Sequence, residues 1–96
     1  MIYIDPPHTS PDYRMLRRGV TIFVTADSIE ELLRFGDQLG WDNDMYFVYP
    51  EVYHFVAYDV TEVMRRQAVR AGAQECPEEE VQRRAERLLA EWEELV

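Results

Sequence analysis

Hydrophobic and polar positions along the first quarter of the chain follow a pattern that predicts two strands. Residues 2–4 form an apolar run that stops at two prolines, because proline cannot continue a strand. Over residues 20–25, β-branched side chains recur at every second position, which is typical of a strand with one buried face. The stretch between them, residues 5–19, contains prolines, a serine and a glycine and is predicted to be a loop.

The period of the apolar positions becomes helical after residue 28. Ser28 and Glu31 have the spacing of a capping box, in which a hydroxyl and a carboxylate satisfy backbone N–H groups at the start of a helix. Gly40 stands where a left-handed residue would end that helix. These signals predict a helix over residues 28–39.

Two further helices are predicted nearer the C-terminus. Thr61 can cap a helix over residues 61–71, which Gly72 would end. An amphipathic C-terminal helix is predicted over residues 77–95, where apolar side chains recur at helical spacing and Pro77 suits the first position.

The middle of the chain is rich in aromatic residues and predicts further strands. Residues 45–49 and 52–58 are aromatic and β-branched and are separated by Pro50-Glu51, which favours two strands around a short turn or one bulged strand. A last short strand is predicted over residues 73–76.

Strands that alternate with helices predict the fold class. The chain of 96 residues is long enough for one core and too short for two. We therefore predict a single small α/β domain over residues 1–96, with a mixed, mostly parallel sheet of about four or five strands and three helices.

Short segments along the chain carry a resemblance to a known family. They are Ile2-Tyr3-Ile4-Asp5, Thr25-Ala26-Asp27-Ser28, Leu39-Gly40, Tyr58-Asp59-Val60 and Ala68-Val69-Arg70-Ala71-Gly72-Ala73. Over about residues 2–76 the chain resembles domain-of-unknown-function family 4031, whose members are small bacterial and phage proteins. The resemblance implies the same order of elements. Family members tend to carry histidine where this chain has Phe23 and Ala57, so the resemblance implies that any imidazole chemistry of the family is missing here.

The charge of the chain narrows the class of partner. Nineteen carboxylates face ten cations, all of them arginine, which gives a formal net charge of −9. Proteins that bind nucleic acids or anionic membranes use cations to do so, so the charge argues against both. An acidic surface that docks on a basic site of another protein is compatible with it.

The cysteine content and the N-terminal residues bear on the compartment. The single cysteine, Cys76, excludes an intramolecular disulfide and favours a reducing compartment. The N-terminus lacks the pattern of a secretory signal, and no apolar run reaches the roughly 18 residues of a membrane span. We expect a cytoplasmic protein.

Three aspartates stand where predicted strands end: Asp5, Asp27 and Asp59. If these strands are parallel neighbours, the three carboxylates converge at the edge of the sheet where ligands gather. Such a cluster could hold Mg²⁺ or Mn²⁺ for the hydrolysis of a phosphoester. The competing explanation is local, because helix caps and turns also favour aspartate.

Other catalytic motifs are weak or missing in the sequence. His8 and His54 are isolated and make a poor zinc signal. The four glycines form neither a phosphate-binding loop nor a dinucleotide motif, and no nucleophile elbow occurs. We predict no cofactor.

One predicted loop gathers cations in an otherwise acidic chain. Tyr13, Arg14, Arg17 and Arg18 lie close together in it. Guanidinium groups match the geometry of phosphate and a tyrosine can stack on a base, so the loop is a candidate for binding a nucleotide or another phosphorylated small molecule. The alternative is that these arginines pair with carboxylates of the protein itself.

Aromatic residues are more numerous between residues 41 and 58 than one core can bury. Exposed aromatic side chains mark protein interfaces, and the interface candidates are Trp41, Tyr46, Tyr49, Tyr53 and Trp92. Along the C-terminal helix, apolar residues alternate at spacings of four and three, which permits self-association as well as packing on the sheet.

These observations favour a binding or inhibitor module over an enzyme. The leading expectation is a phage-type accessory protein that acts on a host protein through its acidic, aromatic-rich surface, and that forms a homo-oligomer. The alternatives are a phosphoesterase that uses a divalent metal at Asp5, Asp27 and Asp59, and a binder of phosphorylated ligands.

Overall fold

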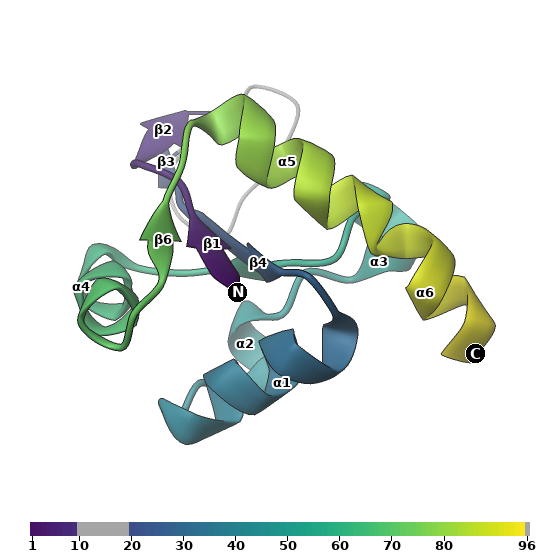
Figure 1. The fold of residues 1–96 in the computed structure, drawn as a ribbon, viewed down its shortest axis with the longest axis horizontal. Helices are drawn as coiled ribbons and strands as arrows, with labels where there is room; N and C mark the ends of the chain where they lie inside the picture. The colour runs from purple at the N-terminus through teal and green to yellow at the C-terminus, as the bar shows by residue number, and fades with distance from the viewer. Residues whose placement is uncertain (10–19, 96) are drawn as a thin grey trace.

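A four-stranded mixed sheet forms the centre of the molecule (Figure 1). The computed structural model describes residues 1–9 and 20–95. The strands lie in the order β5 (Tyr58–Asp59), β4 (Phe23–Ala26), β1 (Ile2–Ile4) and β6 (Gln74–Glu75). A separate two-stranded ladder pairs β2 (His8–Thr9) with β3 (Val20–Thr21).

The expectation of a mostly parallel sheet is wrong. Strand β1 runs antiparallel to β4, and β4 runs antiparallel to β5; only β6 is parallel to its neighbour, β1. The reason is that the chain leaves β1 through β2 and returns through β3, which are antiparallel partners and reverse its direction. The predicted helix over residues 61–71 does connect two strands that run the same way, β5 and β6. These are the two outermost strands of the sheet and are not neighbours.

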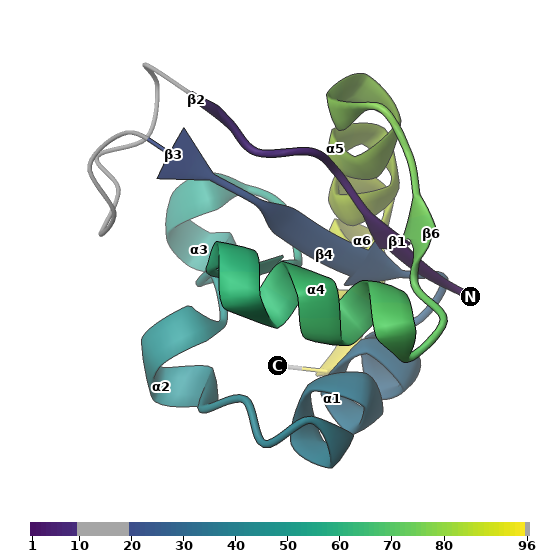
Figure 2. The same ribbon diagram turned by 90° about the vertical axis from the view of Figure 1, so that its left-hand side faces the viewer.

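Helices cover both faces of the sheet (Figure 2). Side chains of α1 (Ile29–Gln38) and α4 (Glu62–Arg70) pack with Ile4 and Val24 in one core cluster. Side chains of α5 (Glu78–Arg87) pack with Tyr3 and Phe23 in a second cluster on the other face. The period of two along β1 and β4 therefore divides their side chains between two buried faces.

Local signals set the ends of α1 and α4, and the sequence prediction of both is confirmed. The Ser28 hydroxyl accepts a hydrogen bond from the Glu31 N–H at 3.1 Å, and the Thr61 hydroxyl accepts one from the Met64 N–H at 3.1 Å. Gly40 follows α1 with φ +77° and Gly72 follows α4 with φ +103°, a backbone region that favours glycine.

The prediction of two strands over residues 45–49 and 52–58 is wrong. That segment instead forms α2 (Asn43–Tyr46) and α3 (Pro50–Tyr53), and only Tyr58–Asp59 is a strand. The Asp42 carboxylate accepts from the Asp44 N–H at 2.8 Å and caps α2, while Pro50 occupies the first turn of α3. Capping and proline position thus outweigh the strand preference of the aromatic side chains.

The helix predicted over residues 77–95 is divided at Leu88 into α5 and α6 (Leu89–Leu95). The Ala85 carbonyl accepts hydrogen bonds from the Val56 N–H at 3.0 Å and from the Leu88 N–H at 3.3 Å. These two bonds occupy the acceptor that the Leu89 N–H would use in a continuous α-helix. Pro77 lies just outside α5, at its N-cap.

None of the helices in the described part of the chain is long and apolar enough to cross a membrane.

Candidate functional site

The antiparallel pairing of β1 with β4 separates the three aspartates. Asp5 follows β1 and lies beside Phe23, whose N–H donates to Asp5 Oδ1 at 2.8 Å. Phe23 in turn is paired with Asp59 on β5, so Asp5 and Asp59 lie at the same edge of the sheet. Asp27 lies at the opposite edge, where its N–H donates to the Met1 carbonyl at 3.3 Å.

The expected three-carboxylate metal site is therefore not assembled. The expectation required parallel strands, whose carboxyl ends share one edge. Within residues 1–9 and 20–95, no group of three or more His, Cys, Asp or Glu side chains is placed to hold a metal ion.

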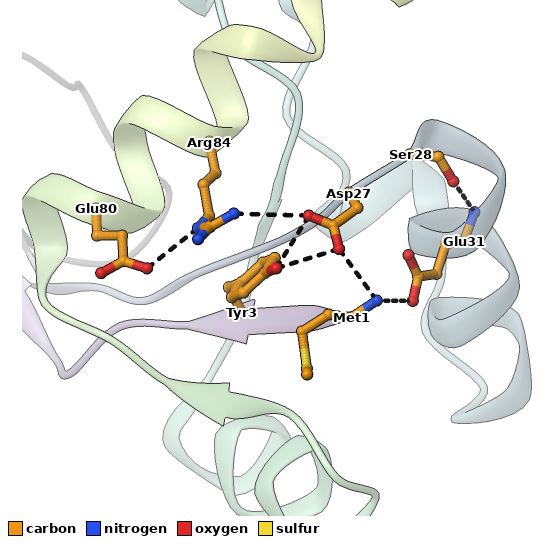
Figure 3. A network of polar contacts seen from close by, with 7 residues as sticks. All are labelled: Met1, Tyr3, Asp27, Ser28, Glu31, Glu80 and Arg84. Atoms are coloured by element: carbon orange, nitrogen blue, oxygen red, sulfur yellow. Dashed lines mark hydrogen bonds and ion pairs between the residues drawn. The ribbon is translucent and has the colours of Figure 1, made fainter.

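Asp27 is the centre of a polar network at its own edge of the sheet (Figure 3). The Tyr3 hydroxyl lies 3.0 and 3.1 Å from the two Asp27 carboxylate oxygens. The N-terminal amine lies 3.4 Å from the same carboxylate and also binds Glu31. Arg84 lies 3.6 Å from Asp27, with its guanidinium 4.0 Å above the centre of the Tyr3 ring. The network joins the starts of β1 and α1 to α5, which is a structural role for Asp27.

Asp5 belongs to a buried cluster at the other edge. Its side chain is fully buried, and its Oδ2 lies 2.9 Å from His8 Nε2. Burial raises the pKa of Asp5 to about 6, although the Phe23 N–H and the nearby His8 act in the opposite direction. The Thr21 hydroxyl lies 3.3 Å from His8 Nδ1 and donates to the His8 carbonyl at 3.2 Å.

His8 was missed as a partner of Asp5 in the sequence. Its other nitrogen, Nδ1, lies 3.5 Å from Glu78 Oε1 at the start of α5, so both ring nitrogens face carboxylates. This arrangement fastens β2 to β1 and α5. The only local signal was the spacing of three residues across Pro6 and Pro7.

A pocket of about 240 Å³ opens beside α2 and α3. Its lining consists of Asp44, Met45, Tyr46, Phe47, Val48, Tyr49, Tyr53 and Asp59. Three large apolar side chains on these two helices or next to them are strongly exposed: Met45 at 57%, Tyr49 at 53% and Val52 at 64%. We call residues 43–53 the α2–α3 surface.

The structure divides the aromatic interface candidates. Tyr46, Tyr49 and Tyr53 line the pocket of the α2–α3 surface. Trp41 is only 7% exposed and packs edge-on against Phe35 and Tyr58, so it belongs to the core and not to a surface. Trp92 is partly buried and donates its indole N–H to Glu51 at 2.9 Å.

The α2–α3 surface lies in a segment of the chain that has carboxylates but no lysine or arginine. Residues 35–64 contain no lysine or arginine. The same segment contains six carboxylates: Asp37, Asp42, Asp44, Glu51, Asp59 and Glu62. Three of these carboxylates are exposed: Asp42 caps α2, Asp44 lies on α2 and Glu51 lies on α3.

The predicted arginine loop lies outside the described residues. Tyr13, Arg14, Arg17 and Arg18 all fall within residues 10–19. Binding of a phosphorylated ligand by these side chains stays a prediction.

The two positions where the family resemblance implies histidine are apolar and buried. Phe23 is 3% exposed and Ala57 is fully buried, and both belong to the core cluster beneath α5. The Phe23 ring lies 5.6 Å from the His8 ring and 5.1 Å from the Phe55 ring. An imidazole is therefore present at this edge, but it comes from β2.

Comparisons place the chain by its sequence alone. A search of curated proteins and one of solved structures give no match. The model of one family, described as "protein of unknown function (DUF4031)", matches residues 2–88. Because this match spans most of the 96 residues, the chain belongs to the DUF4031 family.

Proposed function

We propose that the protein is a binding module that docks its α2–α3 surface on a basic region of a protein partner. The observation that carries the proposal is the exposure of Met45 and Tyr49 at the pocket, and of Val52 on α3, in a segment without lysine or arginine. Large apolar side chains exposed together and bordered by polar groups are a feature of interaction surfaces.

The apolar side chains supply the free energy of such a contact. Complete burial of a valine, methionine or aromatic side chain is worth about 1.5–3 kcal/mol. Met45, Tyr49 and Val52 are a little over half exposed, so burying the rest of all three is worth about 2.5–5 kcal/mol, close to the lower estimates of the cost of association, about 4 kcal/mol. A contact of this size fits a weak or transient partner.

The size of the pocket supports a protein partner over a free small molecule. Sites for drug-sized ligands occupy roughly 300–1,000 Å³, whereas this pocket measures about 240 Å³. A pocket of that size accepts one side chain of a partner, and its Tyr46, Tyr49 and Tyr53 rings suit an apolar or aromatic one.

The charge of the segment supports a basic partner. Asp42, Asp44 and Glu51 are exposed on or beside α2 and α3, and like charges on a partner would be repelled. A basic region that presents an apolar side chain between cations would match both the pocket and its border.

Titration with short peptides tests the proposal. The probe is acetyl-Arg-Trp-Arg-amide, with acetyl-Glu-Trp-Glu-amide as its acidic counterpart, and the readout is the change of NMR chemical shifts. We expect saturable shifts at Met45, Tyr49 and Val52 with the basic peptide and much weaker ones with the acidic peptide.

A pair of matched variants locates the contact. Neither valine lines the pocket, but Val52 is 64% exposed on α3, within the α2–α3 surface, whereas Val63 is 58% exposed on α4, outside that surface. Val52→Ala is expected to weaken binding of the basic peptide, and Val63→Ala is expected to leave it unchanged. Equal shifts with both peptides, or equal loss in both variants, would overturn the proposal.

A further inference from the structure

A second hollow lies between α3 and α6, apart from the pocket of the α2–α3 surface. It measures about 390 Å³ and is lined by Pro50, Glu51, His54, Leu89, Trp92 and Glu93. Figure 1 shows α3 behind the junction of α5 and α6, which brings these two distant parts of the chain together.

Contacts within the protein fix the indole of Trp92 in this hollow. Its N–H donates to Glu51 Oε2 at 2.9 Å, and its ring lies 5.8 Å from the Phe47 ring at an interplanar angle of 39°. The indole is thus held from two directions, by α3 and by the residue that follows α2. Preorganised aromatic rings lose little conformational entropy when a ligand binds.

The lining has the chemistry of a site for an organic cation. Glu51 and Glu93 supply two carboxylates, and no lysine or arginine of the described residues lines the hollow. Among aromatic side chains, tryptophan attracts cations most strongly. An anion would be repelled by the carboxylates. His54 also lines the hollow, but no group of three His, Cys, Asp or Glu side chains in the described part of the chain is placed to hold a metal ion.

We propose that the hollow between α3 and α6 binds the guanidinium or ammonium group of a basic side chain. The cation lies against the Trp92 indole and pairs with Glu51 and Glu93. The proposal takes from the proposed function only the source of the cation, a basic protein partner. Its test uses free amino-acid derivatives, so the two ideas can fail separately.

The experiment follows the indole N–H resonances during titration with cationic probes. The probes are N-acetyl-arginine methylamide and N-acetyl-lysine methylamide, which distinguish guanidinium from ammonium, and N-acetyl-glutamine methylamide is the neutral reference. We expect a saturable shift of the Trp92 resonance with at least one cationic probe and none with the neutral reference. The buried Trp41 provides an internal control whose resonance should not move.

Two neighbouring glutamates provide matched variants. Glu93 lines the hollow and Glu94 does not, although both are exposed, so neither substitution should prevent folding. Glu93→Gln is expected to weaken binding of the effective probe by about two- to fivefold, the range of exposed ion pairs, and Glu94→Gln to leave it unchanged.

Three results would overturn the inference. They are a Trp92 resonance that responds equally to the neutral reference, one that moves with no cationic probe, and an equal loss in both glutamate variants. If any one of them occurs while acetyl-Arg-Trp-Arg-amide still shifts Tyr49, the hollow is excluded and the proposed function stands. If the cationic probes shift Trp92 but the peptide does not shift Tyr49, the hollow binds cations and the proposed function is excluded.

Discussion

Asp5 shows how one residue combines a local signal with a long-range environment. Its position before two prolines was visible in the sequence, but its burial and its contacts with Phe23 and His8 depend on strand pairing. Ser28, Thr61, Gly40 and Gly72 behave differently, because their roles involve backbone groups within a few residues. Caps could therefore be predicted from the sequence, and the Asp5 cluster could not.

The buried carboxyl of Asp5 predicts a pH-dependent contribution to stability. Its pKa is raised from 3.8 to about 6, so the folded protein binds this proton more tightly than the unfolded chain does. The contribution of Asp5 is therefore fully present below about pH 4 and is lost as the pH rises through about 6, to a total of roughly 3 kcal/mol.

Urea unfolding of the wild type and of Asp5→Asn from pH 4 to pH 8 measures this contribution. The free energy of unfolding of the wild type, minus that of the variant, is expected to fall over this range, because the asparagine side chain of the variant does not titrate. The nearby groups that also act on the Asp5 carboxyl are His8 and Glu78. Two parallel curves would show that Asp5 does not titrate with a raised pKa.

At the scale of elements, caps and periodicity predicted the helices that have a sheet beneath them. Alternation predicted β4, and the capping residues predicted α1 and α4. The aromatic segment around Pro50 was wrongly predicted to form strands, because aromatic residues favour strands and are also common at buried positions of any secondary structure. Its helices are only four residues long, too short for a helical period to be recognised. The pocket beside α2 and α3 could not be predicted either, because it depends on these two short helices.

The contact between α1 and β5 depends on a glycine. A Cβ atom at Gly36 would lie 2.4 Å from the Tyr58 hydroxyl oxygen and 2.5 Å from Cζ. Tyr58 cannot easily move, because it is fully buried and its hydroxyl donates to Asn43 Oδ1 at 2.6 Å. The close approach of helix and strand therefore requires a residue without a side chain.

Gly36→Ala is expected to destabilise the protein, although alanine favours helices by about 1 kcal/mol. Overpacking of this kind costs about 1–3 kcal/mol, and the measurement is the free energy of urea unfolding. Gly40→Asn serves as a control for a substitution in open space, because nothing lies within 4 Å of a Cβ there. Its φ of +77° strains any side chain, asparagine less than most, so a smaller loss of stability than that of Gly36→Ala is expected. If Gly36→Ala is as stable as the wild type, α1 and β5 do not approach as closely as described.

At the scale of the whole molecule, the order of elements was predicted more successfully than their directions. The class of fold and a sheet of about four strands follow from alternating patterns. The alternation of strands and helices favoured a parallel sheet, but it does not reveal the β2–β3 pairing, which reverses the chain and involves only four residues. The error in direction is also what made Asp27 look like a neighbour of Asp5 and Asp59.

The charge of the molecule is distributed unevenly, and this predicts how a partner would be bound. The net charge is −9, and the stretch from residue 35 to residue 64 has no lysine or arginine. Attraction between this segment and a basic partner acts at a distance and is screened by salt, with a Debye length of about 10 Å at 0.1 M.

Binding of acetyl-Arg-Trp-Arg-amide to the α2–α3 surface is therefore expected to weaken about fivefold between 20 mM and 500 mM salt, roughly 1 kcal/mol of screened attraction. Measuring the dissociation constant by NMR titration at several salt concentrations gives the slope. The double variant Asp44→Asn with Glu51→Gln should flatten this slope, since it removes two exposed charges from the surface. Glu86→Gln, an exposed position on α5, should not. A dissociation constant that does not change with salt would mean that apolar contacts alone hold the peptide, and the acidic segment would then have no part in choosing a basic partner.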